Sequence, residues 1–141
     1  MFERYTETVR KMVVRAKHEA DRFGSREVCS EHILLALLND ASLIKDTMDG
    51  VSETELREAI TVYLPRGEII RVKHDLPLSA ESRQALIFAA EEAEGFGHRY
   101  IGNEHLLLGL MRSESGYVAG LLKQKGLSTA KLRSRIAGPE S

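Results

Sequence analysis

An internal duplication constrains the fold of this chain more than any other feature. The segment SEHILLALL around Glu31 recurs as NEHLLLGLM around Glu104, 73 residues further along. The same spacing aligns identical residues before the motif: Arg10 with Arg83, Ala16 with Ala89, Glu19 with Glu92, Ala20 with Ala93, Phe23 with Phe96, Gly24 with Gly97 and Arg26 with Arg99. Beyond the motif the first copy is three residues shorter, and Gly50 aligns with Gly126. The repeat predicts two units of similar structure.

Each copy opens with apolar residues at helical spacing. They are Val9, Met12, Val13, Ala16, Ala20 and Phe23 in the first copy and Leu86, Ala89, Ala90, Ala93 and Phe96 in the second. This pattern predicts a long amphipathic helix in each copy. Thr6 and Ser79 are the expected N-caps, because a hydroxyl oxygen can accept a free backbone N–H. Gly24 and Gly97 are expected to end the two helices.

Three shorter helices are expected after each long one. The second begins at Ser30 or Asn103, taken as N-caps, and its runs ILLALL and LLLGLM predict burial on most sides. The third and fourth helices are expected at Ser42–Met48 and Ser52–Tyr63, and at Ser115–Gln124 and Ser128–Ile136.

The predicted fold class is therefore all-α, with two pseudo-twofold-related four-helix repeats packed as a single domain. Neither repeat alone is large enough to bury its apolar faces, so the two are expected to pack together. The expected boundaries are a domain over 1–141, with repeat 1 at about 1–64, an extended linker at about 65–77 and repeat 2 at about 78–138.

Composition limits the classes of partner. Twenty basic and twenty-one acidic side chains leave a net charge of −1, so no general field attracts nucleic acid or an anionic membrane. Charges at Glu3, Arg4 and Glu7 stand where a signal peptide would be apolar, and no apolar run is long enough to span a bilayer. The lone Cys29 suits a reducing compartment. We expect a cytoplasmic protein, monomeric in isolation.

No pattern in the sequence predicts catalysis, a cofactor or a metal. The chain has no G-x-x-x-x-G-K-[ST] motif, which nucleotide binding by a P-loop requires. His32 and His105 each follow a glutamate, but adjacent helical residues point about 100° apart and do not converge on one ion. We expect each histidine to be a packed or capping side chain.

Two long segments resemble the N-terminal domain of Clp-type unfoldases, the ClpC type in particular. They are FERYTETVRKMVVRAKHEA near the start and GHRYIGNEHLLLGLMRSESGYVAGLL from Gly97 to Leu122. The resemblance implies a non-catalytic recognition domain that binds adaptor or substrate proteins for a Clp ATPase motor and its protease core. It leaves open whether the chain is the N-domain of an unfoldase or a stand-alone accessory subunit that docks on a Clp protease core.

The candidate binding residues lie at the start of the second helix in each copy: Ser30, Glu31, Asn103 and Glu104. Unpaired N–H groups and a positive dipole end there lie beside a carboxylate. The resemblance implies that these positions receive phosphorylated arginine, with the carboxylate gripping the guanidinium and the helix start accommodating the phosphate. The structural alternative is that each glutamate only complements the helix dipole, which is worth about 0.3–1 kcal/mol.

The two copies depart differently from the G-T-E-H pattern of the family. The first reads Cys-Ser-Glu-His and the second Gly-Asn-Glu-His. Cys29 adds bulk where glycine would let a ligand approach the backbone, and Asn103 replaces a hydroxyl group. We therefore expect the Glu104 site to be the better of the two.

Overall fold

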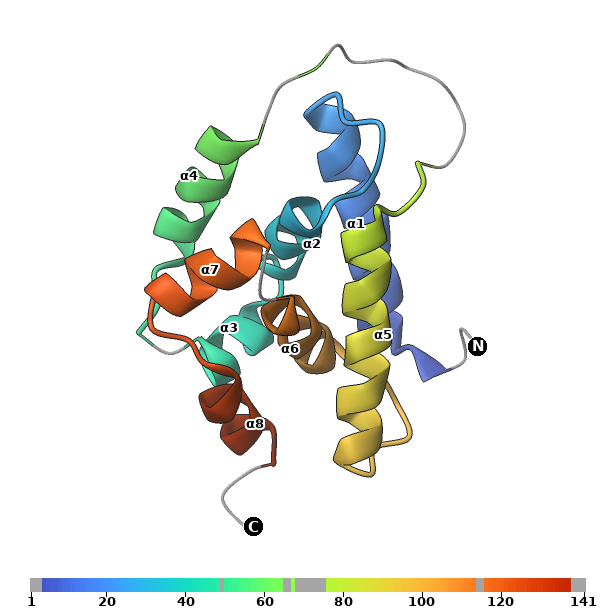
Figure 1. Ribbon diagram of the computed structural model, residues 1–141, viewed down its shortest axis with the longest axis vertical. Helices are drawn as coiled ribbons and strands as arrows, with labels where there is room; N and C mark the ends of the chain where they lie inside the picture. The colour runs from blue at the N-terminus through green and yellow to red at the C-terminus, as the bar shows by residue number, and fades with distance from the viewer. Residues whose placement is uncertain (1–3, 49, 65–66, 68–75, 114–115, 138–141) are drawn as a thin grey trace.

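The structure is a computed structural model that describes residues 4–48, 50–64, 67, 76–113 and 116–137. Its helices follow in the order α1 (Glu7–Arg22), α2 (Ser30–Leu37), α3 (Ala41–Thr47), α4 (Glu53–Tyr63), α5 (Ala80–Gly95), α6 (Asn103–Arg112), α7 (Tyr117–Gln124) and α8 (Thr129–Ala137) (Figure 1). In the described part of the chain, β structure is limited to two isolated bridges. The all-α prediction is confirmed.

The ends of the two long helices are set by local sequence, as predicted. Thr6 Oγ1 accepts the N–H of Val9 at 3.1 Å, and Ser79 Oγ accepts that of Ser82 at 3.0 Å. After the helices, Gly24 and Gly97 adopt φ values of 70° and 72°, which residues with a Cβ rarely adopt. The aligned residues therefore make the same start and the same stop in both copies.

The prediction that Ser30 and Asn103 are N-caps is wrong. Both are the first helical residues of their helices, and the N-caps are Cys29 and Gly102. The physical reason lies three residues into each helix, where a histidine ring reaches back to the N–H of the cap residue, as described below. The shorter helices otherwise begin and end within about two residues of their expected bounds.

Most of the predicted linker lies outside the described residues. Of its residues only Gly67, Leu76 and Pro77 are described, so the expected extended conformation is untested. The start expected for α7 at Ser115 is also outside the described part, and α7 is assigned from Tyr117. The division of the chain into repeat, linker and repeat stays a prediction.

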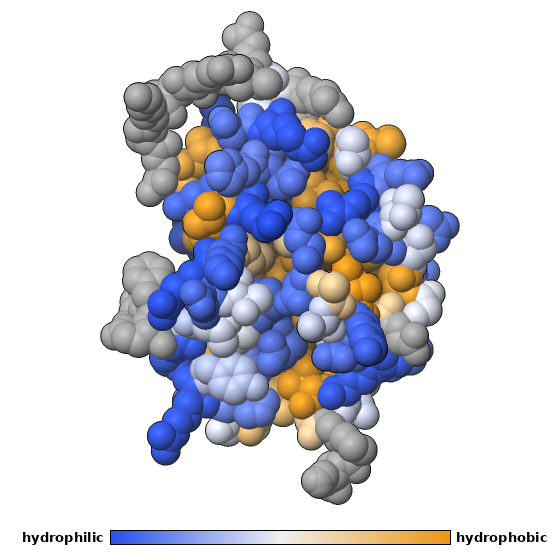
Figure 2. All heavy atoms as spheres, turned by 180° about the vertical axis from the view of Figure 1, so that it is seen from behind, coloured by the Kyte–Doolittle hydropathy of each residue, from blue (hydrophilic) through white to orange (hydrophobic). Residues whose placement is uncertain are grey.

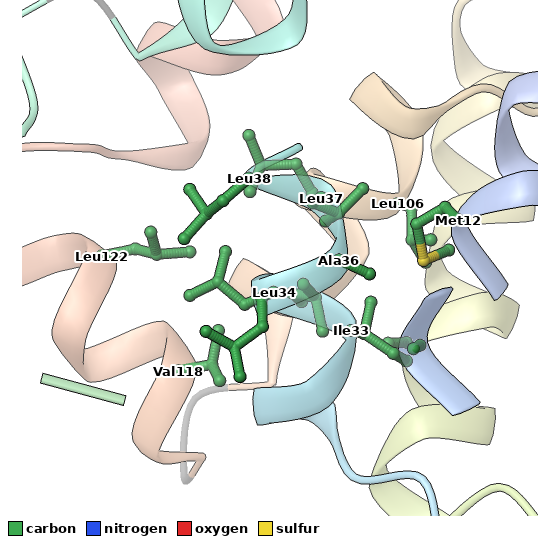
Figure 3. Close-up of a cluster of buried hydrophobic side chains, with 14 of the residues drawn as sticks. Met12, Ile33, Leu34, Ala36, Leu37, Leu38, Leu106, Val118 and Leu122 are labelled. Carbon is green, nitrogen blue, oxygen red and sulfur yellow. The ribbon is translucent and has the colours of Figure 1, made fainter. Parts of the chain in front are cut away.

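The hydrophobic core is built around the two motif helices. Every residue of α2 is buried, and so are all residues of α6 except Glu104 and Arg112. Figure 3 shows side chains of α2 directed on one side toward Met12 of α1 and on the other toward Val118 and Leu122 of α7. The long apolar runs thus correctly predicted helices that are buried on most sides.

Two crosswise bridges join the copies. Tyr5 pairs with Ile101, and Val28 pairs with Leu78. The 73-residue spacing relates Tyr5 to Leu78 and Val28 to Ile101, so the two bridges are equivalent under the pseudo-twofold relation. Each bridge brings the start of one copy's long helix beside the start of the other copy's motif helix. We call these junctions the α6 site, where α1 and α6 begin, and the α2 site, where α5 and α2 begin.

One of the differences between the helix pairs α1–α2 and α5–α6 is a glycine at their contact. Gly109 of α6 aligns with Ala36 of α2. A Cβ on Gly109 would collide with the carbonyl oxygen of Ala85 in α5. The absence of a side chain at Gly109 therefore lets α6, which carries Glu104, lie close against α5.

Candidate functional site

The start of α6 is held by a histidine pair. The N–H of Gly102 donates to Nδ1 of His105 at 2.9 Å. His105 must then carry its proton on Nε2, which lies 2.9 Å from Nδ1 of His98. Burial is the largest cause that lowers the pKa of His105. The expectation that His105 is a packed, capping residue is confirmed.

The start of α2 has the same bond but no second histidine. The N–H of Cys29 donates to Nδ1 of His32 at 2.9 Å. Nε2 of His32 is buried and has no hydrogen-bond partner in the described part of the chain. Burial lowers the pKa of His32 to about 4. His32 is thus also a packed, capping residue, and it is neutral at pH 7.

At the α6 site, Glu104 lies partly in the open. Its side chain is half-buried, and a Cβ on Gly102 would come too close to its carboxylate, so a side chain at position 102 would push this carboxylate aside. Tyr100, which is 43% exposed, is hydrogen-bonded to Glu104. Burial raises the pKa of Tyr100, and the charge of Glu104 and a hydrogen bond to it raise it further. The site therefore presents a half-buried carboxylate close to a glycine and hydrogen-bonded to a tyrosine.

At the α2 site the equivalent glutamate is enclosed. Glu31 is only 8% exposed, and burial raises its pKa, as does the charge of Glu81. Cys29 carries a side chain where Gly102 has none, so Glu31 has no room for the position that Glu104 takes. Of the two candidate glutamates, Glu31 is therefore the more enclosed.

Cys29, the N-cap residue of α2, lies near several carboxylates. The thiol is half-buried, and burial is the largest cause that raises its pKa. The charges of Glu31, Glu27 and Glu81 raise it further. Glu27 aligns with Tyr100, so at this position the α2 site has a carboxylate where the α6 site has a phenol.

Ser30 and Asn103 turn their side chains toward the other copy. Ser30 Oγ donates to a carboxylate oxygen of Glu81, in the first turn of α5. Asn103 Nδ2 donates to Oδ2 of Asp40 at 2.9 Å, while Oδ1 of Asp40 accepts the N–H of Leu43 and caps α3. Sequence reasoning missed Glu81 and Asp40. The only signal for them was an acidic residue near a predicted helix start.

The described residues hold no group of three or more His, Cys, Asp or Glu side chains that could bind a metal ion. No helix assigned there is long and apolar enough to cross a membrane. Figure 2 shows one face of the surface, on which hydrophobic residues lie between hydrophilic ones.

A model of the Clp repeat N-terminal domain matches residues 4–125 and, separately, 77–138. The chain belongs to the Clp N-terminal domain family. It is 36% identical over 140 residues to the ATP-binding subunit of an ATP-dependent Clp protease, a ClpA homologue, from Guillardia theta. It is 34% identical over 140 residues to the chloroplastic chaperone protein ClpC1 from Arabidopsis thaliana. Each match covers 96% of this chain but only 17% and 15% of those relatives, so the chain corresponds to a small part of their length.

Solved Clp N-domains share the fold. The N-terminal domain of ClpD from Arabidopsis thaliana superposes with a TM-score of 0.73 at 22% identity, covering 96% of this chain and 93% of that one. The N-domain of ClpV from Vibrio cholerae gives 0.79 at 15% identity, with coverages of 96% and 84%. A complex of a ClpV N-domain with a VipB peptide gives 0.77 at 15% identity, with coverages of 97% and 87%.

Proposed function

We propose that the chain is a non-catalytic recognition module of the Clp unfoldase and protease system. It binds adaptor or substrate proteins for ATP-dependent unfolding and degradation. Membership of the Clp N-domain family supports this role, and a related ClpV N-domain has been solved with a bound VipB peptide. His32 and His105, the side chains best suited to acid–base chemistry, are engaged in holding helix starts. This use of the two rings favours binding over catalysis.

The ligand that suits the α6 site is an arginine side chain phosphorylated on its guanidinium group. The observation that carries the proposal is the half-buried carboxylate of Glu104 beside the starts of two helices, α6 and α1. A carboxylate binds guanidinium N–H groups through charge-assisted hydrogen bonds. The backbone N–H groups and positive dipole ends at helix starts attract a phosphate. Both halves of the ligand thus meet complementary groups in one place.

Calorimetry with a phosphoarginine peptide tests this site. A charge-assisted hydrogen bond contributes about 1.5–3 kcal/mol, so Glu104→Ala should weaken binding roughly ten- to more than a hundred-fold. The free energy of unfolding of the Glu104→Ala variant should change by less than about 1 kcal/mol, because a glutamate that complements a helix dipole contributes no more than that. Binding should also weaken with salt, since both partners are charged and the site is partly open.

Controls separate this site from general charge effects. Glu58→Ala removes an exposed glutamate from α4 and should leave binding unchanged. The same peptide with unmodified arginine should bind more weakly, because it lacks the phosphate. If millimolar phosphoarginine does not bind, or if Glu104→Ala binds as the native chain does, the proposal is wrong.

The Clp ATPase motor and protease core remain predicted partners. Co-purification of the chain with the protease ring, without substrate, would favour the stand-alone accessory role. A cytoplasmic location, a monomeric state and the lack of nucleic-acid binding are proposed on the sequence arguments above.

A further inference from the structure

We propose that Glu81 closes the α2 site to phosphorylated arginine, so that the domain takes one such residue, at the α6 site. This inference rests on the proposed function. Its starting point is the hydrogen bond from Ser30 Oγ to the Glu81 carboxylate, which joins residues 51 positions apart in the sequence. The carboxylate of Glu81 thus lies at the start of α2.

Three helix starts lie around the Glu81 carboxylate. Glu81 itself belongs to the first turn of α5, and Ser30 is the first residue of α2. Gly116 is the N-cap of α7, and a Cβ built on it would lie 3.1 Å from Oε1 of Glu81. Helix starts attract anions, and at this junction a carboxylate already occupies the place that a phosphate would take.

The surroundings add to the exclusion of phosphate. A phosphate group on the ligand carries close to two negative charges, and it would meet Glu81 together with Glu31 and Glu27. The hydroxyl hydrogen of Ser30 is also committed to Glu81. At the α2 site a phosphorylated arginine would therefore face repulsion and would find this donor already used.

The α6 site lacks this carboxylate. The residue aligned with Glu81 is Thr8, which is exposed in the first turn of α1. The carboxylate that accepts from Asn103 belongs to Asp40, and its other oxygen is engaged by the N–H of Leu43 in α3. At this position α1 thus carries an uncharged residue where α5 carries Glu81, and the first-turn carboxylate of α1 is the exposed Glu7, one position earlier.

Exchanging the aligned residues tests the inference. Titration calorimetry with a phosphoarginine peptide should give one site per native chain, and Glu104→Ala should weaken binding at that site. Glu81→Thr, which installs the residue found at position 8, should raise the stoichiometry from one to two. The double variant Cys29→Gly, Glu81→Thr also gives the α2 site the glycine that the α6 site has at position 102. It removes the bulk of Cys29, which could keep a ligand out by itself.

The reciprocal change should close the α6 site. Thr8→Glu places a carboxylate in the first turn of α1 and should weaken binding at Glu104 at least ten-fold. Glu55→Thr removes a first-turn glutamate from α4 and is the matched control for Glu81→Thr. We expect it to leave phosphoarginine binding unchanged. Thermal unfolding of each variant verifies that the chain is folded.

The outcomes distinguish this inference from the proposed function. Two sites in the native chain, or one site in both Glu81 variants, would overturn the inference and leave phosphoarginine recognition standing. A native chain that binds nothing, with Glu81→Thr binding one equivalent, would keep the role of Glu81 and overturn the Glu104 site. An absence of binding in the native chain and in both Glu81 variants would overturn both.

Discussion

The α2 and α6 sites are built on the same backbone and have come to differ in their side chains. Each has an extended N-cap residue, a histidine that reaches back to its N–H at 2.9 Å, and a bridge to the other copy. Glu31 is nevertheless enclosed among other carboxylates, whereas Glu104 lies half-buried beside Gly102. A duplicated scaffold can therefore keep its helix starts while one copy encloses its glutamate and the other leaves it half-buried.

The interiors of the two copies differ as well. His105 has His98 as a partner, whereas Nε2 of His32 has none among the described residues. Glu92 pairs with Arg112 of α6 and Arg133 of α8 and so joins three helices. At the aligned position in the first copy, the ion pair of Glu19 among the described residues is with Arg22 of its own helix.

The largest effect should come from the acid titration of His32. Its pKa falls from 6.5 in the unfolded chain to about 4 in the folded one, so only the unfolded chain gains this proton between those values. Stability should therefore fall as pH decreases from about 6.5 to 4, by about 3 kcal/mol from this residue. Urea unfolding across this range should show that the stability of His32→Gln depends less on pH, because glutamine does not titrate. Glutamine can also reach back to the cap N–H, so the helix start is kept. An unchanged pH dependence would contradict this.

The contact of α5 with α6 offers the next test. Gly109→Ala should destabilise the fold by about 1–3 kcal/mol, because the new methyl group collides with backbone of α5 at Ala85. In the first copy, Ala36→Gly should cost about 1 kcal/mol through helix propensity, with a further loss from the missing buried methyl. Denaturant midpoints would compare the two. Equal or greater stability in Gly109→Ala would show that the second pair has no need of its glycine.

Removing the acidic partner of each ion pair should have a smaller, unequal effect. Hydrogen bonds from Arg133 and the nearby positive charges lower the pKa of Glu92, and its side chain is only 10% exposed. Glu92→Gln should destabilise the chain by about 1–2 kcal/mol. Glu19→Gln should cost less than about 1 kcal/mol, because Arg22 is largely exposed. Thermal unfolding with and without salt would measure both losses. An equal loss of stability in Glu92→Gln and Glu19→Gln would show that the network around Glu92 does not add to stability.

The smallest effect, and one of opposite sign, is expected at Glu31. Its raised pKa means that the folded chain holds this proton more tightly than the unfolded chain. Stability from this residue is therefore present at low pH and is lost as pH rises through its unfolded and then its folded pKa. Glu31→Gln should be more stable than the native chain at pH 7 and should lose that advantage near pH 4. A loss of stability at pH 7 would show that the charged form is favoured.

The sequence by itself determined the elements of this fold and their burial. Thr6, Ser79, Gly24 and Gly97 act within a few residues of their own position, so helix starts and stops could be predicted from local chemistry. The repeated apolar runs predicted the buried motif helices because burial follows from the lack of a polar face. The same alignment predicted that the Glu104 site is the less crowded one, since Cys29 and Gly102 differ in bulk.

Only the tertiary structure decided what surrounds each glutamate. The partner of Ser30 is Glu81 and that of Asn103 is Asp40, each in the other copy and far along the chain. No local pattern specifies such a pair, because it depends on how the two copies bring their helix starts together. The enclosure of Glu31 has the same origin, since exposure is a property of packed neighbours and not of the residue itself.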